Sequence, residues 1–275
     1  MAENDAVLSV RGVGYAYPGA SSPALDEVTL EVARGEWTAL VGANGSGKST
    51  FAKICNALLN PTQGACFVRG LDTAAPENQR EIRRNVALVF QNPEDQIVAS
   101  IVEEDVAFGP ENLGLPHAEI RRRVDDALER VGLAPFRRRG SYSLSGGQKQ
   151  RLALAGALAL GPDILVLDES TSMLDPEGRE DFLACLKSLK KNGMTILQIT
   201  HRMEEAVASD RIVVMSRGRN VWDGSPADFF DGAYRAWGFE EPDEIALYRR
   251  LLAERFVPAS TPPTVRAMLE VLCLS

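Results

Sequence analysis

One stretch of the sequence, Gly42–Thr50, combines residue types and spacing that suit phosphate chemistry. Its letters, GANGSGKST, match the pattern G-x-x-x-x-G-K-[ST], which is meaningful when a strand precedes it and a helix follows. The apolar run Trp37–Val41 predicts a buried strand, and Phe51–Leu59 predicts a helix. A chance glycine-rich turn is the alternative, and both flanking elements argue against it. The stretch therefore predicts a binding site for a nucleoside triphosphate.

Each part of this stretch has a physical role in such a site. Its glycines leave the backbone free to turn successive N–H groups toward one anion, at the positive end of the following helix. Lys48 would reach the outer phosphates, and the Ser49 hydroxyl would bind a magnesium ion. The expected nucleotide-binding residues are Gly42, Ala43, Asn44, Gly45, Ser46, Gly47, Lys48, Ser49 and Thr50.

Two carboxylates follow a second apolar run, Ile164–Leu167. In P-loop enzymes such a strand lies beside the phosphate loop, so Asp168 is expected to support the magnesium ion. Glu169 would face the terminal phosphate and accept a proton from an attacking water molecule. An exposed acid pair at a strand end is the alternative. Downstream of a phosphate loop, the pattern favours hydrolysis.

A second candidate phosphate site opens the predicted helix Ser145–Leu160. Its residues Ser145, Gly146, Gly147 and Gln148 would present N–H groups at the positive helix end. An ordinary capped helix is the alternative. Two such sites with room for one nucleotide predict a dimer, in which the second site of each chain closes the first site of the other.

Three further side chains complete the candidate site. Gln91 and His201 each directly follow a predicted strand, where ligands of open α/β sheets bind. A structural or merely exposed histidine is the alternative for His201, while the second histidine, His117, falls in a predicted polar loop. Tyr17 offers a flat face for stacking an adenine, although an aromatic residue in a turn is more often packing.

Bulk composition limits the classes of function. The 275 residues are 45% hydrophobic and 25% charged, with a net charge of -8 and a pI near 5.0, which argues against broad attraction to nucleic acid or anionic lipid. The four cysteines are scattered, as in a reduced cytosolic protein. The polar start is no secretory signal, and no apolar segment approaches the roughly 20 residues of a membrane span. Any membrane role would need another subunit.

The chain reads as one α/β domain with a helical insert and a helical tail. Alternating patterns at Leu8–Tyr17 and Val28–Val32 predict half-buried antiparallel strands before the phosphate loop. The insert spans about residues 92–139, where one helical stripe joins Ile97, Val98, Ile101, Val102 and Val106, and another joins Ile120, Val124, Leu128 and Val131. We therefore expect an α/β P-loop NTPase fold, with a parallel sheet, an antiparallel edge and a helical subdomain.

The expected domain division is a nucleotide-binding domain at residues 1–225 and a C-terminal extension at 226–275. Two helices are predicted in the extension, Asp243–Arg255 and Thr264–Leu274. The core fold does not require them, and a role in dimerisation is one expectation.

The ordered set of motifs resembles the ATP-binding-cassette ATPases from about Val7 to Ser225. That resemblance implies two cassettes that sandwich two ATP molecules with Mg²⁺, the Ser145–Gln148 segment acting on the partner's nucleotide. It implies that Gln91 senses magnesium and couples to a membrane partner, and that His201 holds the terminal phosphate. Asp175 would belong to the loop that couples the two sites.

Finer features resemble the ATPases of energy-coupling factor (ECF) transporters, which import vitamins, cobalt or nickel. They are Gln91–Gln96, Glu103–Gly109, Glu169–Pro176 and the short helical tail, and the match is closest to the first of two paired ATPases. Ser170 stands where that family usually has Ala or Pro, and the segment from His201 to Glu205 departs from the frequent His-Asp-Met pattern without loss of the histidine.

The resemblance implies three kinds of partner: a second ATPase subunit in a homo- or heterodimer, a transmembrane scaffold, and a substrate-binding membrane subunit. It places the chain at the cytoplasmic face of the cell membrane as a peripheral subunit, with no nucleic acid partner. The acids of the insert would receive arginine-bearing helices of the scaffold, unless they form a solvated face; they are Glu94, Asp95, Glu103, Glu104 and Asp105.

Other readings stay open at this point. One is the ATPase of another ATP-binding-cassette transporter. Another is a soluble cassette protein that acts on DNA or ribosomes, although such proteins usually carry a long coiled-coil insert or two cassettes. A third is a regulatory subunit that binds nucleotide without hydrolysis, which the presence of Glu169 and His201 opposes.

Overall fold

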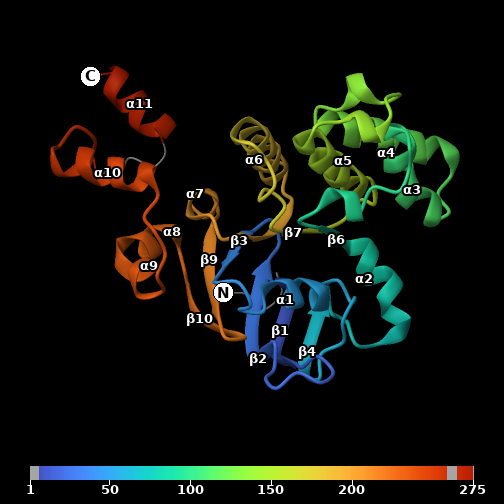
Figure 1. The fold of residues 1–275 in the computed structure, drawn as a ribbon, viewed down its shortest axis with the longest axis horizontal. Coiled ribbons are helices and arrows are strands. Elements are labelled where there is room, and N and C mark those ends of the chain that lie inside the picture. Colours follow the sequence, from blue (N-terminus) through green and yellow to red (C-terminus); the bar gives the residue numbers. More distant parts are fainter. Residues whose placement is uncertain (1–5, 259–264, 275) are drawn as a thin grey trace.

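The computed structural model describes residues 6–258 and 265–274. A six-stranded sheet forms the centre, in the order β10-β9-β3-β8-β7-β6 (Figure 1). Its strands are β3 (Trp37–Val41), β6 (Val86–Val89), β7 (Ile164–Asp168), β8 (Thr195–Ile199), β9 (Arg211–Ser216) and β10 (Arg219–Gly224). All neighbours pair in parallel except β9 and β10, so the carboxyl ends of five strands meet at one edge.

A second, antiparallel sheet of four strands lies below the first in Figure 1. It consists of β1 (Ala6–Tyr15), β2 (Leu25–Ala33), β4 (Gln63–Val68) and β5 (Leu71–Asp72). The alternation of buried and exposed residues in β2 shows why this segment forms a strand with one solvated face. The sheet brings β1 and the turn after it beside the phosphate loop.

Helix α1 (Lys48–Cys55) packs between the two sheets. Its Phe51 and Ile54 are fully buried in a cluster that includes Leu8 of β1 and Val166 of β7. Residues of β7 alternate between this cluster and one on the opposite face, where Leu165 and Leu167 point. Burial on both faces explains why the parallel strands are continuous apolar runs.

Helices α3 (Val102–Asn112), α4 (His117–Arg130) and α5 (Gly146–Ala159) gather at one end of the molecule (Figure 1). They share a cluster with α6 (Pro176–Lys191) that covers the far face of the parallel sheet. Helix α2 (Gln79–Asn85) leads into β6, and α7 (Met203–Ala206) follows β8.

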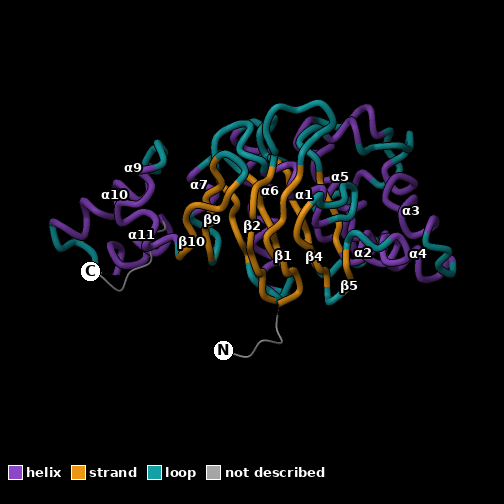
Figure 2. Tube along the Cα trace, turned by 90° about the horizontal axis from the view of Figure 1, so that it is seen from below, coloured by secondary structure: helices purple, strands orange, loops and turns teal. Residues whose placement is uncertain are grey.

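The C-terminal helices extend from the opposite end of the sheet, beside β10, in both views (Figures 1 and 2). They are α8 (Pro226–Asp228), α9 (Tyr234–Ala236), α10 (Asp243–Ala253) and α11 (Val265–Leu274). An aromatic cluster around Phe229 ties the first of them to Trp222 of β10. Of the predicted helix Thr264–Leu274, Thr264 lies outside the described residues.

Among the described residues, none of the helices has both the length and the apolarity needed to cross a bilayer. The predicted α/β fold is confirmed, but some local predictions are wrong. The stripe Ile97–Val106 is not one helix, because α3 begins only at Val102 and Val98 is exposed. His117 is the first residue of α4 rather than part of a loop; Pro116 directly before it is the N-cap, where the helix does not need the N–H that proline lacks.

Helix α1 also differs from the predicted span Phe51–Leu59. It starts three residues earlier, at Lys48, and ends at Cys55. The side chain of Asn56 donates a hydrogen bond to the carbonyl of Val86, and Ala57 takes a positive φ of 54°. These two features end the helix and attach it to β6. The sequence analysis also missed α2 and β5, which carry no strong pattern of their own.

Candidate functional site

The loop between β3 and α1 is held in its turn by close backbone packing. A Cβ at Gly42 would lie 2.2 Å from the carbonyl oxygen of Met215, and one at Gly47 would lie 2.4 Å from that of Ala24. Gly47 also has φ 104° and precedes the first residue of α1. Only glycine fits these two positions, and the loop thereby directs its backbone toward the amino end of α1, a favourable place for an anion.

Lys48 lies inside this loop and is nearly buried. Its ammonium donates to the carbonyl oxygens of Gly42 at 2.8 Å and Ala43 at 3.0 Å. Burial lowers the pKa of Lys48, while the nearby carboxylates of Glu169 and Asp168 act in the opposite direction. A partly desolvated cation of this kind is well placed to bind a phosphate.

Ser49 and Asp168 bring two hard oxygen ligands together from different elements. The Ser49 hydroxyl donates to Oδ1 of Asp168 at 3.0 Å. Burial raises the pKa of Asp168, and this hydrogen bond opposes the rise. Hydroxyl and carboxylate oxygens are ligands that Mg²⁺ prefers, so this pair fits a magnesium ion shared with a phosphate.

Glu169 and His201 meet at the carboxyl edge of the parallel sheet. Nδ1 of His201 lies 3.3 Å from Oε2 of Glu169. Glu169 has a positive φ of 48°, a conformation that costs a residue with a side chain roughly 1–2 kcal/mol. Its backbone N–H donates to the carbonyl of Ile199 at 3.0 Å, so the turn after β7 is tied to the end of β8.

Gln91 follows β6, as predicted, and its loop is attached at several points. Gln96 accepts from the N–H of Phe90 and donates to the carbonyl of Leu88. Gln150 of α5 donates to the carbonyl of Phe90 at 3.0 Å, and Lys149 pairs with Glu94. The sequence analysis named Gln96 only as the end of the segment Gln91–Gln96 and missed Gln150; the repeated glutamines at 91, 96, 148 and 150 were the available signal.

One pocket of about 420 Å³ is lined by several of the predicted site residues. Tyr17 stands at its side, 41% exposed, with its hydroxyl 3.2 Å from Oγ1 of Thr50. The complete lining is Tyr17, Ala24, Asn44, Gly45, Ser46, Gly47, Lys48, Ser49, Thr50, Gln91 and Glu169. The pocket is thus lined by the phosphate loop from Asn44 onward, Tyr17, Gln91 and the expected base Glu169. Asp168 and His201 lie next to this lining, where Asp168 contacts Ser49 and His201 contacts Glu169.

Two predicted segments lie elsewhere in the part of the chain that the structure describes. None of the residues from Ser145 to Gln148 lines this pocket. Ser145 caps α5, since its hydroxyl accepts from the N–H of Gln148 and the Gln148 side chain accepts from the N–H of Ser145. Gly147 packs tightly on Gly178, where Asp175 caps α6. Ser145 and Asp175 are both exposed, so a second molecule can reach them.

The acids of the helical insert do not form one surface, which corrects part of the sequence prediction. Asp105 is 7% exposed, and its Oδ1 accepts from the N–H groups of Val98 and Ala99. Glu94 is paired with Lys149 and Glu103 with Arg137 at 2.9 Å. Asp105 therefore holds the segment before α3 and cannot receive a partner's arginine.

A family profile described as "ABC transporter" matches residues 25–172, more than half of the chain. The energy-coupling factor transporter ATP-binding protein EcfA1 of Symbiobacterium thermophilum is 51% identical, with 97% of this chain and 96% of that protein aligned. The protein of the same name from Clostridium novyi is 46% identical over 98% of this chain and 99% of that protein.

Solved structures agree with these sequence relatives. CbiO1 of Clostridium perfringens, described as part of the ABC transporter complex CbiONQ, superposes with a TM-score of 0.77 at 35% identity, over 83% of this chain and 92% of that one. A dimeric ATP-binding cassette bound to ADP and phosphate superposes with a TM-score of 0.72 at 29% identity, over 80% of this chain and 98% of that one.

Proposed function

The chain belongs to the ABC transporter ATPases, and within them to the ATP-binding proteins of energy-coupling factor transporters, and on that premise we propose that it hydrolyses ATP to drive an importer. The transported substrate is a vitamin or a transition-metal ion that another subunit selects. The observation that carries the proposal is the pair Glu169 and His201, 3.3 Å apart at a pocket built by the phosphate loop.

ATP would lie with its adenine against Tyr17 and its phosphates in the loop Gly42–Thr50. Lys48 would exchange its loop carbonyl partners for the outer phosphates, since a phosphate is the stronger acceptor. Ser49, Asp168 and Gln91 would hold the Mg²⁺ ion, which supplies charge neutralisation for the phosphates when bound.

Glu169 is the general base of the proposed reaction. Its carboxylate accepts a proton from a water molecule that attacks the terminal phosphorus in line with the leaving oxygen. His201, whose ring lies 3.3 Å from the Glu169 carboxylate, donates to the terminal phosphate. Most of the rate enhancement comes from positioning and from fixed charges around the phosphates.

A second cassette completes the site. Ser145–Gln148 and Asp175 lie outside the nucleotide pocket on exposed helix starts, which supports their action on the partner's nucleotide. The ADP-bound relative is described as a dimer, which supports the same arrangement. The partner is a second cassette ATPase, either a copy of this chain or a sister subunit. Exposed Leu247, Phe256 and Leu269 of the C-terminal extension suit an added dimer contact.

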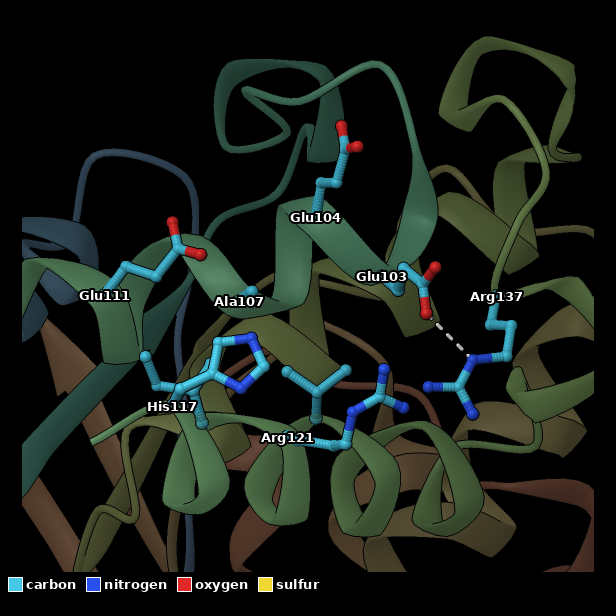
Figure 3. A pocket seen from close by; sticks show the side chains of 9 residues that line it. Glu103, Glu104, Ala107, Glu111, His117, Arg121 and Arg137 are labelled. Atoms are coloured by element: carbon cyan, nitrogen blue, oxygen red, sulfur yellow. Dashed lines mark hydrogen bonds and ion pairs between the residues drawn. The ribbon is translucent and has the colours of Figure 1, made fainter. Parts of the chain in front are cut away.

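The membrane scaffold would dock on the groove between α3 and α4, at the cytoplasmic face of the cell membrane. Figure 3 shows Glu103, Glu104 and Glu111 along α3, with His117 and Arg121 on the facing helix. The groove measures about 210 Å³, and Ala107, Ile120 and Val124 add apolar lining. In the described chain neither Glu104 nor Glu111 forms an ion pair, so both can receive arginine side chains of a membrane subunit.

Replacement of Glu169 by Gln tests the hydrolysis. Loss of the general base should slow turnover by about 10²- to 10⁴-fold, while ATP binding is preserved because the phosphate loop is untouched. The readouts are phosphate release by the full-length chain and titration with a fluorescent ATP analogue. Turnover equal to that of the unaltered chain would remove Glu169 from the mechanism.

A further inference from the structure

A chain of side-chain hydrogen bonds runs through the core beneath the Glu169–His201 pair. The indole of Trp37 donates to Oε1 of Gln198 at 3.0 Å, and the Gln198 amide donates to Oε2 of Glu205 at 2.8 Å. The hydroxyl of Thr171 donates to Oε1 of the same carboxylate at 2.6 Å. All four side chains are at most 2% exposed.

These hydrogen bonds connect the loop that carries Glu169 with the loop that carries His201. Thr171 stands two residues after Glu169, in the turn that follows β7, and Glu205 stands four residues after His201, on α7. Gln198 lies in β8, which leads to His201, and Trp37 begins β3. The Glu205 carboxylate is therefore a direct bridge between the loop of Glu169 and the helix behind His201.

Burial of a carboxylate in a core costs hydration free energy that burial of an apolar side chain does not. Among the described residues Glu205 has no ion-pair partner, and the two side chains that donate to its carboxylate, Thr171 and Gln198, are neutral. An apolar residue would pack at this position at a lower cost. The carboxylate supplies what an apolar residue lacks, two directional acceptors that fix two donors relative to each other.

The backbone of Glu169 needs such support. It adopts the left-handed region at φ 48°, which persists only where surrounding contacts determine it. The hydrogen bond from its N–H to Ile199 holds one side of the turn, and the bond from Thr171 to Glu205 holds the other.

We propose that Glu205 is a positioning residue for the hydrolysis, which holds the Glu169 loop through Thr171 in register with the His201 loop. The inference rests on the proposed ATP hydrolysis and adds two residues to it, Glu205 and Thr171, neither of which lines the nucleotide pocket. Without the bridge the base and the histidine drift apart, while the phosphate loop keeps its shape and its affinity.

Thr171→Val tests this directly, because it removes the hydroxyl and preserves the branched shape. The expected result is a 10- to 100-fold lower kcat, as about 1 Å of misplacement costs, with a KM for ATP changed by less than about twofold. Thr171→Ser keeps the donor and should retain kcat within about threefold.

Thr195→Val is the matched control. Thr195 is equally buried at the amino end of β8, where its hydroxyl accepts from the N–H of Gly35 at 2.9 Å, far along the strand from His201. This variant also removes one hydrogen bond of a buried threonine hydroxyl, here with a neutral backbone N–H, so its melting temperature should fall. Its kcat should stay within about twofold of the unaltered chain.

Glu205 itself is tested with two substitutions. Glu205→Gln can accept from Gln198 and donate to the Thr171 oxygen, so it should keep kcat within about threefold. Glu205→Ala removes both contacts and should match or exceed the loss in Thr171→Val. If the alanine variant does not fold, the Thr171 pair still decides the question.

The outcomes separate this inference from the proposed function. Equal loss of kcat in Thr171→Val and Thr195→Val, or full activity in Thr171→Val, overturns the positioning role while ATP hydrolysis stands. An unaltered full-length chain that binds ATP without releasing phosphate overturns the proposed function, and the positioning role with it.

Discussion

At the residue scale, burial changes the pKa of ionisable groups in the phosphate site and in the helical insert. In each case the change favours the neutral form. It lowers the pKa of Lys48 and raises the pKa of Asp168 and Asp105. A bound phosphate at Lys48 and a bound metal ion at Asp168 would offset the cost of burying the charge, because each ligand carries the opposite charge. Asp105 has no such ligand, and the two N–H groups of Val98 and Ala99 offset its burial only in part.

Asp105 therefore gives a pH-dependent prediction. Because its pKa is raised on folding, the folded chain binds more protons than the unfolded chain, and stability falls as pH rises from about 4 through the folded pKa. Asp105→Asn keeps the oxygen that accepts both N–H groups and removes the buried charge. It should raise the melting temperature at pH 7.5, by about 2–4 °C for each kcal/mol recovered.

The measurement is thermal unfolding followed by circular dichroism at several pH values. The gain should shrink as pH is lowered toward 4, where the unaltered carboxyl becomes protonated. Exposed Asp95→Asn is the control for a simple change in net charge. A gain that does not change with pH would contradict the assignment of the cost to a buried charge.

At the element scale, the loop between β3 and α1 depends on how closely other backbone segments approach it. Positive φ is not the only reason for glycine in this loop. Gly12, outside the loop, also has a positive φ of 56°, but a Cβ there would meet open space. At Gly47 the carbonyl of Ala24 would lie 2.4 Å from a Cβ. The backbone directly before β2 thus packs closely on the phosphate loop and contributes to its shape.

Gly47→Ala and Gly12→Ala separate these two effects. Gly12→Ala should cost about 1–2 kcal/mol of unfolding free energy, the cost of a side chain at positive φ. Gly47→Ala should cost a further 1–3 kcal/mol or so, as overpacking does, and should also weaken ATP binding. Urea unfolding of both variants measures the difference, and equal losses would show that close approach is unimportant.

At the scale of the whole molecule, the nucleotide pocket and the α3–α4 groove are separate, and packed elements connect them. The loop of Gln91 connects them, because it lines the pocket and is bonded to α5 through Gln150 and Lys149. Helix α5 shares the cluster that holds α3 and α4. A change at the nucleotide can thus shift the surface proposed for the membrane scaffold.

Reversal of two charges tests that surface. Glu104→Arg combined with Glu111→Arg should reduce co-purification with membrane proteins at least tenfold, since like charges across an interface cost several kcal/mol. ATP binding should be unchanged. The measurement is capture of partners from native membranes with the full-length chain as bait, followed by mass identification. Glu81→Arg, an exposed acid on α2, is the control.

The captured proteins also test the transporter itself. A small membrane protein with a shared scaffold, and a second cassette ATPase, would support the proposed complex. Ribosomal or DNA-repair partners without a membrane protein would contradict the transport role and leave the hydrolysis standing. Undiminished capture by the double variant would contradict the docking surface alone.

The sequence by itself determined the phosphate loop, the strand that ends at Asp168 with Glu169 after it, and the α/β class. These signals are local: a strand, a turn and a helix follow one another within a few residues, and apolar runs on both faces require a buried parallel sheet. The identity of Gly42, Lys48 and Ser49 as loop residues needs no distant contact to be inferred.

Only the tertiary structure decided which of the remaining polar residues are exposed and what they touch. Asp105 was predicted on a docking surface, yet its carboxylate is turned inward to bind Val98 and Ala99. Glu205 gave no signal, because its partners Thr171 and Gln198 come from other elements. Hydrogen bonds between segments far apart in the chain depend on how the layers pack, and that packing leaves no period or motif in the sequence.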